Sequence, residues 1–278
     1  MSARGRLLSG LVTVVMALAS FAVVGALPAA AHGSTIQYVA LGDSYAAGQG
    51  AGPYLNSCLQ SNKGYPALLD SEKRIHLRAN ESCTGAKTSD VVDTQLSALN
   101  RGTRLVTVTV GAADLGLSDV LAACTTGTPQ CITAIKLASV KLADLGDDLT
   151  DLYAEVADAA PRALIVVTGY PHLFAPEAAP FDPVLVDAIN SAIDALNTTI
   201  EQAVEDADAA DTTDDNIIYV DVIRAFGKHG IGGELPPFIN PPGTPDAFHP
   251  TADGYVAYAN AILAVLPEAW VDEQAQSA

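Results

Sequence analysis

The sequence is poor in basic residues. It has 14 lysines and arginines against 32 aspartates and glutamates, which gives a formal net charge of -18 over 278 residues. Nucleic acids and anionic membrane surfaces are bound mainly through lysine and arginine, so both are unfavourable partners for this chain. The acidity could attract cationic partners, but a solvated acidic surface is the simpler interpretation.

The chain also lacks the cysteine and histidine spacings that are typical of metal sites. It contains no CxxC pair and no cluster of histidines, so we predict neither a metal nor another cofactor. Its four cysteines are an even number, which favours disulfides in an exported protein. Proximity in the sequence favours Cys58 with Cys83 and Cys124 with Cys131, although other pairings remain open.

A long hydrophobic run occurs only at the start of the chain. Two arginines precede an apolar stretch over 7–27, and Pro28 and three alanines follow it. This order is typical of a secretory signal peptide, and the alternative is a retained membrane anchor. We expect residues 1–31 to be removed and 32–278 to form a single exported domain without an anchor, because no linker or repeat divides it.

Short apolar runs alternate with helical patterns along the rest of the chain. The expected strands are 36–41, 76–80, 105–110, 163–168 and 216–222. The expected helices are 64–69, 88–99, 132–159, 184–209 and 251–266, and the expected loops include 46–63 and 115–131. Uniformly apolar strands that alternate with helices indicate a parallel sheet covered on both faces. We therefore predict an α/β fold, a three-layer αβα sandwich with about five strands.

Three of the predicted strands end in small residues. Ser44, Gly85 and Gly111 each lie just after a strand, in segments rich in glycine, serine and alanine. In an open parallel sheet the carboxyl ends of the strands meet at one edge, where ligands bind. We therefore expect these three segments to form one site.

A serine, an acid and a base are available for that site. Ser44 follows the first strand, and Asp246 precedes His249 by three residues near the end of the chain. Gly-Asp-Ser alone is ordinary turn chemistry, and Asp-x-x-His alone would be a loop histidine beside a turn former. Together on an α/β fold they predict a catalytic triad, in which His249 takes the proton of Ser44 and Asp246 orients His249. His172 and His229 are expected as loop residues and not as metal ligands.

The chain resembles the SGNH hydrolases, also called GDSL lipases and esterases, and most of all the secreted actinobacterial lipases and phospholipases. The segments that carry the resemblance are Leu41-Gly42-Asp43-Ser44-Tyr45, Ser82-Cys83-Thr84-Gly85-Ala86, Val110-Gly111-Ala112-Ala113-Asp114 and Asp246-Ala247-Phe248-His249-Pro250. The resemblance implies a flavodoxin-like fold and a serine hydrolase that cleaves carboxylic esters through an acyl-enzyme. It also implies that the backbone N–H groups of Ser44 and Gly85 bind the oxyanion.

One position departs from the family pattern. The third segment of the family normally reads Gly-x-Asn-Asp, and its asparagine donates a hydrogen bond to the oxyanion, whereas this chain has Ala113 there. Loss of one such donor costs ~10²–10³ in turnover. The protein is therefore predicted to be a weakened esterase, or one with another donor such as Asn240, although the simpler interpretation of Asn240 is a loop residue. The alternative is a catalytically impaired protein that binds lipid or glycan.

Overall fold

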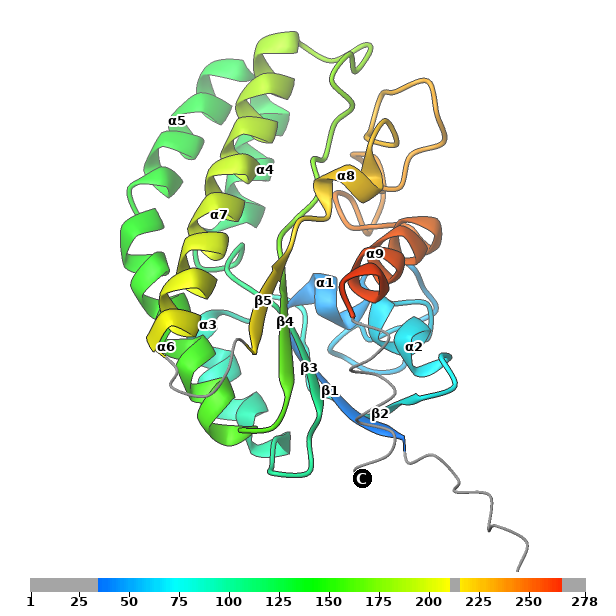
Figure 1. Ribbon diagram of the computed structural model, residues 1–278. Helices are drawn as coiled ribbons and strands as arrows, with labels where there is room; N and C mark the ends of the chain where they lie inside the picture. Colours follow the sequence, from blue (N-terminus) through cyan, green and yellow to red (C-terminus); the bar gives the residue numbers. More distant parts are fainter. Residues whose placement is uncertain (1–34, 211–215, 267–278) are drawn as a thin grey trace, which may run out of the picture. The chain divides into compact units, whose positions relative to one another are not determined.

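A parallel sheet of five strands forms the centre of the fold. The strands are β1 (Ile36–Gly42), β2 (Ile75–Asn80), β3 (Leu105–Thr109), β4 (Leu164–Thr168) and β5 (Ile217–Val220). Their order in the sheet is β2-β1-β3-β4-β5, and every neighbouring pair is parallel. The computed structural model describes residues 35–210 and 216–266 (Figure 1). The expected signal peptide, residues 1–31, lies outside the described residues.

Helices cover both faces of this sheet. On one side lie the irregular turn of α3 (Thr88–Asp90), η1 (Val91–Gln95) and η2 (Leu96–Ala98), with α4 (Leu117–Thr126), α5 (Thr128–Ser139), α6 (Leu142–Ala159) and α7 (Pro183–Ala210). On the other lie α1 (Ser44–Ala47), α2 (Tyr65–Asp70), α8 (Ile223–Phe226) and α9 (Ala252–Val265) (Figure 1). The predicted three-layer α/β architecture is confirmed. Within the described ranges, no helix combines the length and apolarity needed to cross a membrane.

Two helical predictions were wrong in detail. The expected helix over 132–159 is two helices, α5 and α6, which meet at a turn around Val140 and Lys141. The expected loop over 115–131 contains α4, which buries Val120, Leu121 and Cys124. Gly127 alone separates α4 from α5, and the Cys124–Cys131 disulfide connects the two helices. The pairing preferred from the sequence is present here.

The strand order places a crevice at the ends of β1 and β3. The chain leaves β1 toward β2 at one edge and then crosses to β3 on the opposite side of β1. Connections that depart in opposite directions from neighbouring strands leave room between them at the carboxyl edge, where ligands bind in open α/β sheets. The segment after β1 begins with Asp43 and Ser44, and the segment after β3 contains Ala112 and Ala113. The fold therefore brings two of the predicted site segments together.

Candidate active site

A tight turn after β1 presents Ser44. Gly42 ends the strand with a φ of 128°, and a Cβ there would lie 2.1 Å from the carbonyl oxygen of Thr109 on β3. Only glycine fits this close approach of two backbones. Asp43 caps the short helix α1, because its Oδ1 accepts the N–H of Tyr45 at 2.9 Å. Ser44 is thus the first residue of a helix at the carboxyl edge of the sheet.

His249 reaches Ser44 from the far end of the chain. Its Nε2 lies 2.9 Å from Oγ of Ser44, and its Nδ1 lies 3.2 Å from the carbonyl oxygen of Ala247. A proton on Nδ1 is donated to that carbonyl, which leaves Nε2 free to accept the serine proton. Burial lowers the pKa of His249, although the nearby backbone groups and Asp246 oppose the shift. The imidazole is therefore held neutral, as a base requires.

The carbonyl of Ala247 stands where the sequence predicted the carboxylate of Asp246. The turn from Asp246 to His249 closes through a backbone hydrogen bond of 3.1 Å, and Phe248 has a left-handed φ of 68°. In this geometry the ring faces the backbone of its own turn. The Asp246 side chain instead meets Tyr54, where burial and then this hydrogen bond raise the pKa of Tyr54 to about 12. Asp246 acts on His249 through its charge.

Hydrogen bonds hold this turn against the Ser44 segment. The hydroxyl of Tyr45 donates to the carbonyl of Phe248 at 2.6 Å. Nδ2 of Asn240 donates to the carbonyl oxygens of Gly50 at 3.1 Å and His249 at 3.0 Å. Since its N–H groups serve these carbonyls, Asn240 has none to offer an oxyanion. Asn240 is a loop residue, and its side chain connects this loop to the loop of Gly50.

Ser44 and His249 line one pocket with Gly85 and Ala113. The complete lining is Asp43, Ser44, Tyr45, Gln49, Thr84, Gly85, Ala112, Ala113, Leu117, Ser118, Leu121, Phe248 and His249. Within the described part of the chain, neither the N–H of Ser44 nor that of Gly85 has an acceptor. Gly85 has a φ of 77°, a conformation that favours glycine. These two free donors match the arrangement of an oxyanion hole, and Ala113 adds only a methyl group.

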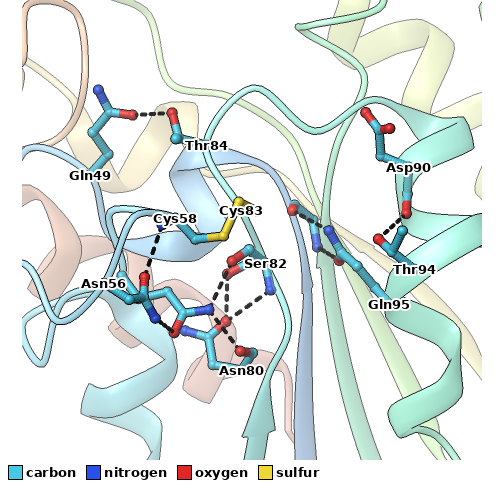
Figure 2. The surroundings of a disulfide bond; sticks show 12 residues. Gln49, Asn56, Cys58, Asn80, Ser82, Cys83, Thr84, Asp90, Thr94 and Gln95 are labelled. Atoms are coloured by element: carbon cyan, nitrogen blue, oxygen red, sulfur yellow. Dashed lines mark hydrogen bonds between the residues drawn. A yellow bond between two sulfur atoms is a disulfide. The ribbon is translucent and has the colours of Figure 1, made fainter.

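The second predicted segment is tied to both of its neighbours. The Cys58–Cys83 disulfide joins it to the loop after α1, as the sequence favoured (Figure 2). On the other side, the Asp114 carboxylate accepts the hydroxyl of Thr88 at 2.9 Å and its N–H at 3.2 Å. Gly85 therefore lies between two fixed points, which holds its N–H at the edge of the pocket.

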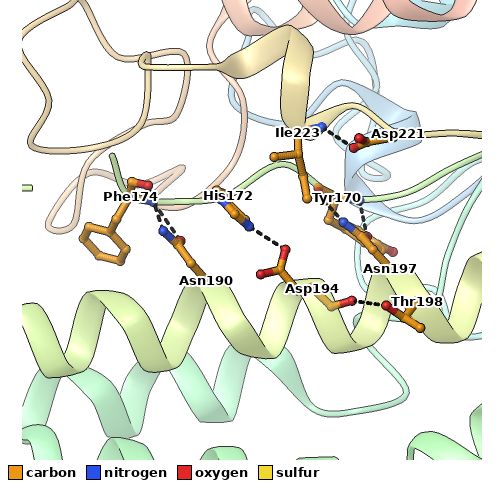
Figure 3. A network of polar contacts seen from close by, with 9 residues as sticks. All are labelled: Tyr170, His172, Phe174, Asn190, Asp194, Asn197, Thr198, Asp221 and Ile223. Atoms are coloured by element: carbon orange, nitrogen blue, oxygen red, sulfur yellow. Dashed lines mark hydrogen bonds and ion pairs between the residues drawn. The ribbon is translucent and has the colours of Figure 1, made fainter. Parts of the chain in front are cut away.

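A network of hydrogen bonds connects Asp43 to helix α7 through Tyr170. Asn197 on α7 holds the backbone of Tyr170 through two hydrogen bonds of 2.8 Å (Figure 3). The hydroxyl of Tyr170 in turn donates to Oδ2 of Asp43 at 2.6 Å. Burial raises the pKa of Asp43 to about 7, and the hydrogen bonds from the Tyr170 hydroxyl and the backbone N–H of Tyr45 oppose the shift. The network thereby connects α7 to the turn that carries Ser44.

An apolar cavity adjoins the pocket. It is lined by residues of α4, α5, α6 and α7, with Leu173 and Pro171 from the loop after β4. Tyr45, Ala112, Leu117 and Leu121 line both the cavity and the Ser44 pocket, so the two lie next to each other. A lining of this composition favours hydrocarbon over a charged group.

His172 and His229, the two histidines predicted as loop residues, lie in loops. Nε2 of His172 lies 2.6 Å from Oδ1 of Asp194 on α7 (Figure 3). His229 stacks on Phe238, and its Nδ1 lies 2.8 Å from the carbonyl of Pro236. Over residues 35–210 and 216–266 there is no group of three potential metal ligands.

Sequence comparison gives the affiliation. The sequence model described as the GDSL-like lipase/acylhydrolase family matches residues 40–257. The chain belongs to this family. It is 33% identical to Lipase 1 of Streptomyces coelicolor over 90% of this chain and 94% of that protein. Membership supports an ester hydrolase and confirms the resemblance seen in the sequence.

Two solved structures of Streptomyces enzymes resemble this chain in fold. The extracellular lipase of Streptomyces rimosus is 32% identical and covers 83% of this chain and 99% of its own, with a TM-score of 0.75. Phospholipase A1 of Streptomyces albidoflavus gives the same identity and coverage, with a TM-score of 0.76.

Proposed function

We propose that this protein is an exported serine hydrolase that cleaves carboxylic esters of lipase or esterase type through an acyl-enzyme. The observation that carries the proposal is the 2.9 Å contact between Ser44 Oγ and His249 Nε2, inside a pocket with two unpaired backbone donors. A serine hydroxyl is a poor nucleophile until a neighbouring base removes its proton. The neutral imidazole supplies that base here.

The reaction follows from these positions. Ser44 Oγ attacks the ester carbonyl while its proton passes to Nε2 of His249, and the carbonyl of Ala247 stabilises the resulting imidazolium through Nδ1. The N–H groups of Ser44 and Gly85 stabilise the oxyanion. His249 then returns the proton to the departing alkoxide. Water deprotonated by His249 releases the acid and restores Ser44. The net reaction consumes only the ester and water.

The apolar cavity offers a binding site for one part of the ester. Because it adjoins Ser44 and is lined almost entirely by hydrocarbon, we assign it to the acyl group. Two disulfides in the described residues are compatible with an oxidising compartment, which supports export. The predicted signal peptide over 1–31 remains a prediction.

The test combines turnover with covalent labelling. We expect the purified protein to hydrolyse p-nitrophenyl esters and to react with a fluorophosphonate at Ser44. Ser44→Ala should abolish both, whereas Ser118→Ala, which alters another serine of the same pocket, should keep the label. Hydrolysis that persists in Ser44→Ala would contradict the mechanism. No turnover and no label in the wild-type protein would favour the alternative, a binding protein for lipid or glycan.

A further inference from the structure

Ala113 leaves the oxyanion side of the pocket with two backbone donors where the family pattern has a third, from a side chain. A replacement has to be a side-chain N–H or O–H that lines the same pocket and is not already bonded elsewhere. Apart from Ser44 and His249, four lining residues carry such groups, namely Tyr45, Gln49, Thr84 and Ser118. The structure allows each of these to be considered in turn.

Three of the four are poorly suited. The hydroxyl of Tyr45 donates to the carbonyl of Phe248 at 2.6 Å, and that of Thr84 donates to Oε1 of Gln49 at 2.7 Å. Ser118 is an exposed residue at the start of α4, so water competes for its hydroxyl. Stabilisation of an oxyanion needs a donor that is already oriented and shielded from water.

Gln49 meets both conditions. Only 9% of its surface is exposed, and its backbone is fixed at both ends: its N–H donates to the carbonyl of Ser44 at 3.0 Å, and its carbonyl accepts the hydroxyl of Tyr255 at 2.7 Å. The Thr84 hydroxyl holds Oε1, which turns the amide nitrogen away from Thr84 (Figure 2). Among the described residues, Nε2 has no acceptor.

The position of this amide relates it to the oxyanion donors. Thr84, which holds it, immediately precedes Gly85 in the chain, and the carbonyl bonded by Gln49 N–H is that of Ser44 itself. Gln49 is therefore bonded to both segments that supply the backbone donors, through its side chain to one and through its backbone to the other. We propose that Nε2 of Gln49 donates the third hydrogen bond to the oxyanion, in place of the asparagine that Ala113 replaces. This inference rests on the proposed ester hydrolysis.

The experiment compares steady-state kinetics on p-nitrophenyl butyrate in two backgrounds. Gln49→Met removes the amide at similar length and should lower kcat by ~10²–10³ with little change in KM, because the bond forms only as charge develops on the oxygen. In the Ala113→Asn background the same substitution should cost less than ~10-fold, because the introduced amide supplies the donor. A purely structural role for Gln49 would not be relieved by asparagine at 113.

Two further variants separate folding from chemistry. Gln49→Glu keeps an oxygen for the Thr84 hydroxyl but has no N–H to donate, so it should lose at least as much kcat as Gln49→Met, and circular dichroism should show both variants folded. Gln202→Met, the matched control at an exposed amide on α7 outside the pocket, should keep wild-type kcat. Wild-type kcat in Gln49→Met, or an equal loss with and without Ala113→Asn, would overturn the proposal and leave the serine hydrolase standing. A wild-type protein without serine-dependent turnover would overturn the proposed function instead.

Discussion

The two sides of the Ser44 pocket differ in how their polar groups are used. On the base side, made of the 246–249 turn with Tyr45 and Asn240, the hydrogen bonds are closed: Nδ1 of His249 faces a carbonyl, and Asn240 bonds two more. On the oxyanion side, made of Ser44, Gly85, Ala113 and Gln49, donors face the pocket without acceptors among the described residues.

This difference indicates which groups are already hydrogen-bonded in the free protein and which are available to bind a substrate. Closed hydrogen bonds fix the base before an ester arrives, so they contribute to stability as well as to geometry. Open donors on a rigid backbone cost some stability but need no reorganisation when negative charge develops. A change on the base side should therefore affect both folding and proton transfer, whereas a change on the oxyanion side should affect mainly kcat.

The largest expected effect on the base side comes from His249→Gln. Glutamine can still hydrogen-bond but cannot take a proton, so kcat should fall by ~10²–10⁴, the usual contribution of general acid–base catalysis. KM for a p-nitrophenyl ester should change little. Steady-state kinetics measure both values. A variant that keeps more than a tenth of wild-type kcat would show that His249 is not the base.

Asn240→Leu should lower the free energy of unfolding, because the Asn240 amide connects two loops. Removing Nδ2 leaves the half-buried carbonyl of Gly50 without that donor, whereas the carbonyl of His249 keeps the backbone N–H of Asn240. The loss of one such hydrogen bond costs about 0.5–1.5 kcal/mol. Urea denaturation measures this loss in the free energy of unfolding. Gln202→Leu, which alters an exposed amide on α7, is the control and should change it little. Equal stability of Asn240→Leu and wild type would argue against a closed base side.

The smallest effect is expected for Asp246→Asn. Where an aspartate holds the catalytic imidazole, this substitution lowers kcat by ~10⁴, but here the carbonyl of Ala247 has that place, so we expect less than ~10-fold. The negative charge of Asp246 favours the imidazolium, and its removal should lower the pKa of His249 further. The acid limb of kcat/KM should therefore move to lower pH. A loss of 10³ or a shift to higher pH would restore Asp246 as the orienting group.

Sequence patterns predicted the parts of the fold that periodicity encodes. The strand from Leu105 to Thr109 is buried at every position, and its apolar, β-branched sequence indicated this directly. The break between α5 and α6 was not visible, because no glycine or proline interrupts the helical pattern near Val140. The signal for α4 was present, since Leu117, Val120, Leu121 and Cys124 recur at helical spacing between Gly116 and Gly127.

Side-chain type predicted which residues come into contact in the site, but not which backbone groups form hydrogen bonds with them. Ser44 and His249 were recognised by type, and the topology explains how they come together. The carbonyl of Ala247 could not be anticipated, because every residue has a carbonyl and only the left-handed φ of Phe248 aims this one at the ring. Gln49 was overlooked as a polar residue between two glycines of the nucleophile segment, and its bond to Thr84 depends on tertiary contact.

The proposed nucleophile Ser44 and its proposed base His249 lie 205 positions apart in the chain, and this spacing has a consequence for biosynthesis. At ~5–20 residues per second, a ribosome adds His249 roughly 10–40 s after Ser44. Throughout that interval Ser44 is an ordinary alcohol, because nothing yet takes its proton. Under the proposed mechanism, a nascent or prematurely terminated chain therefore does not hydrolyse the esters around it. The proposed pair of Ser44 and His249 is completed only late, when the 246–249 turn packs beside Gly50.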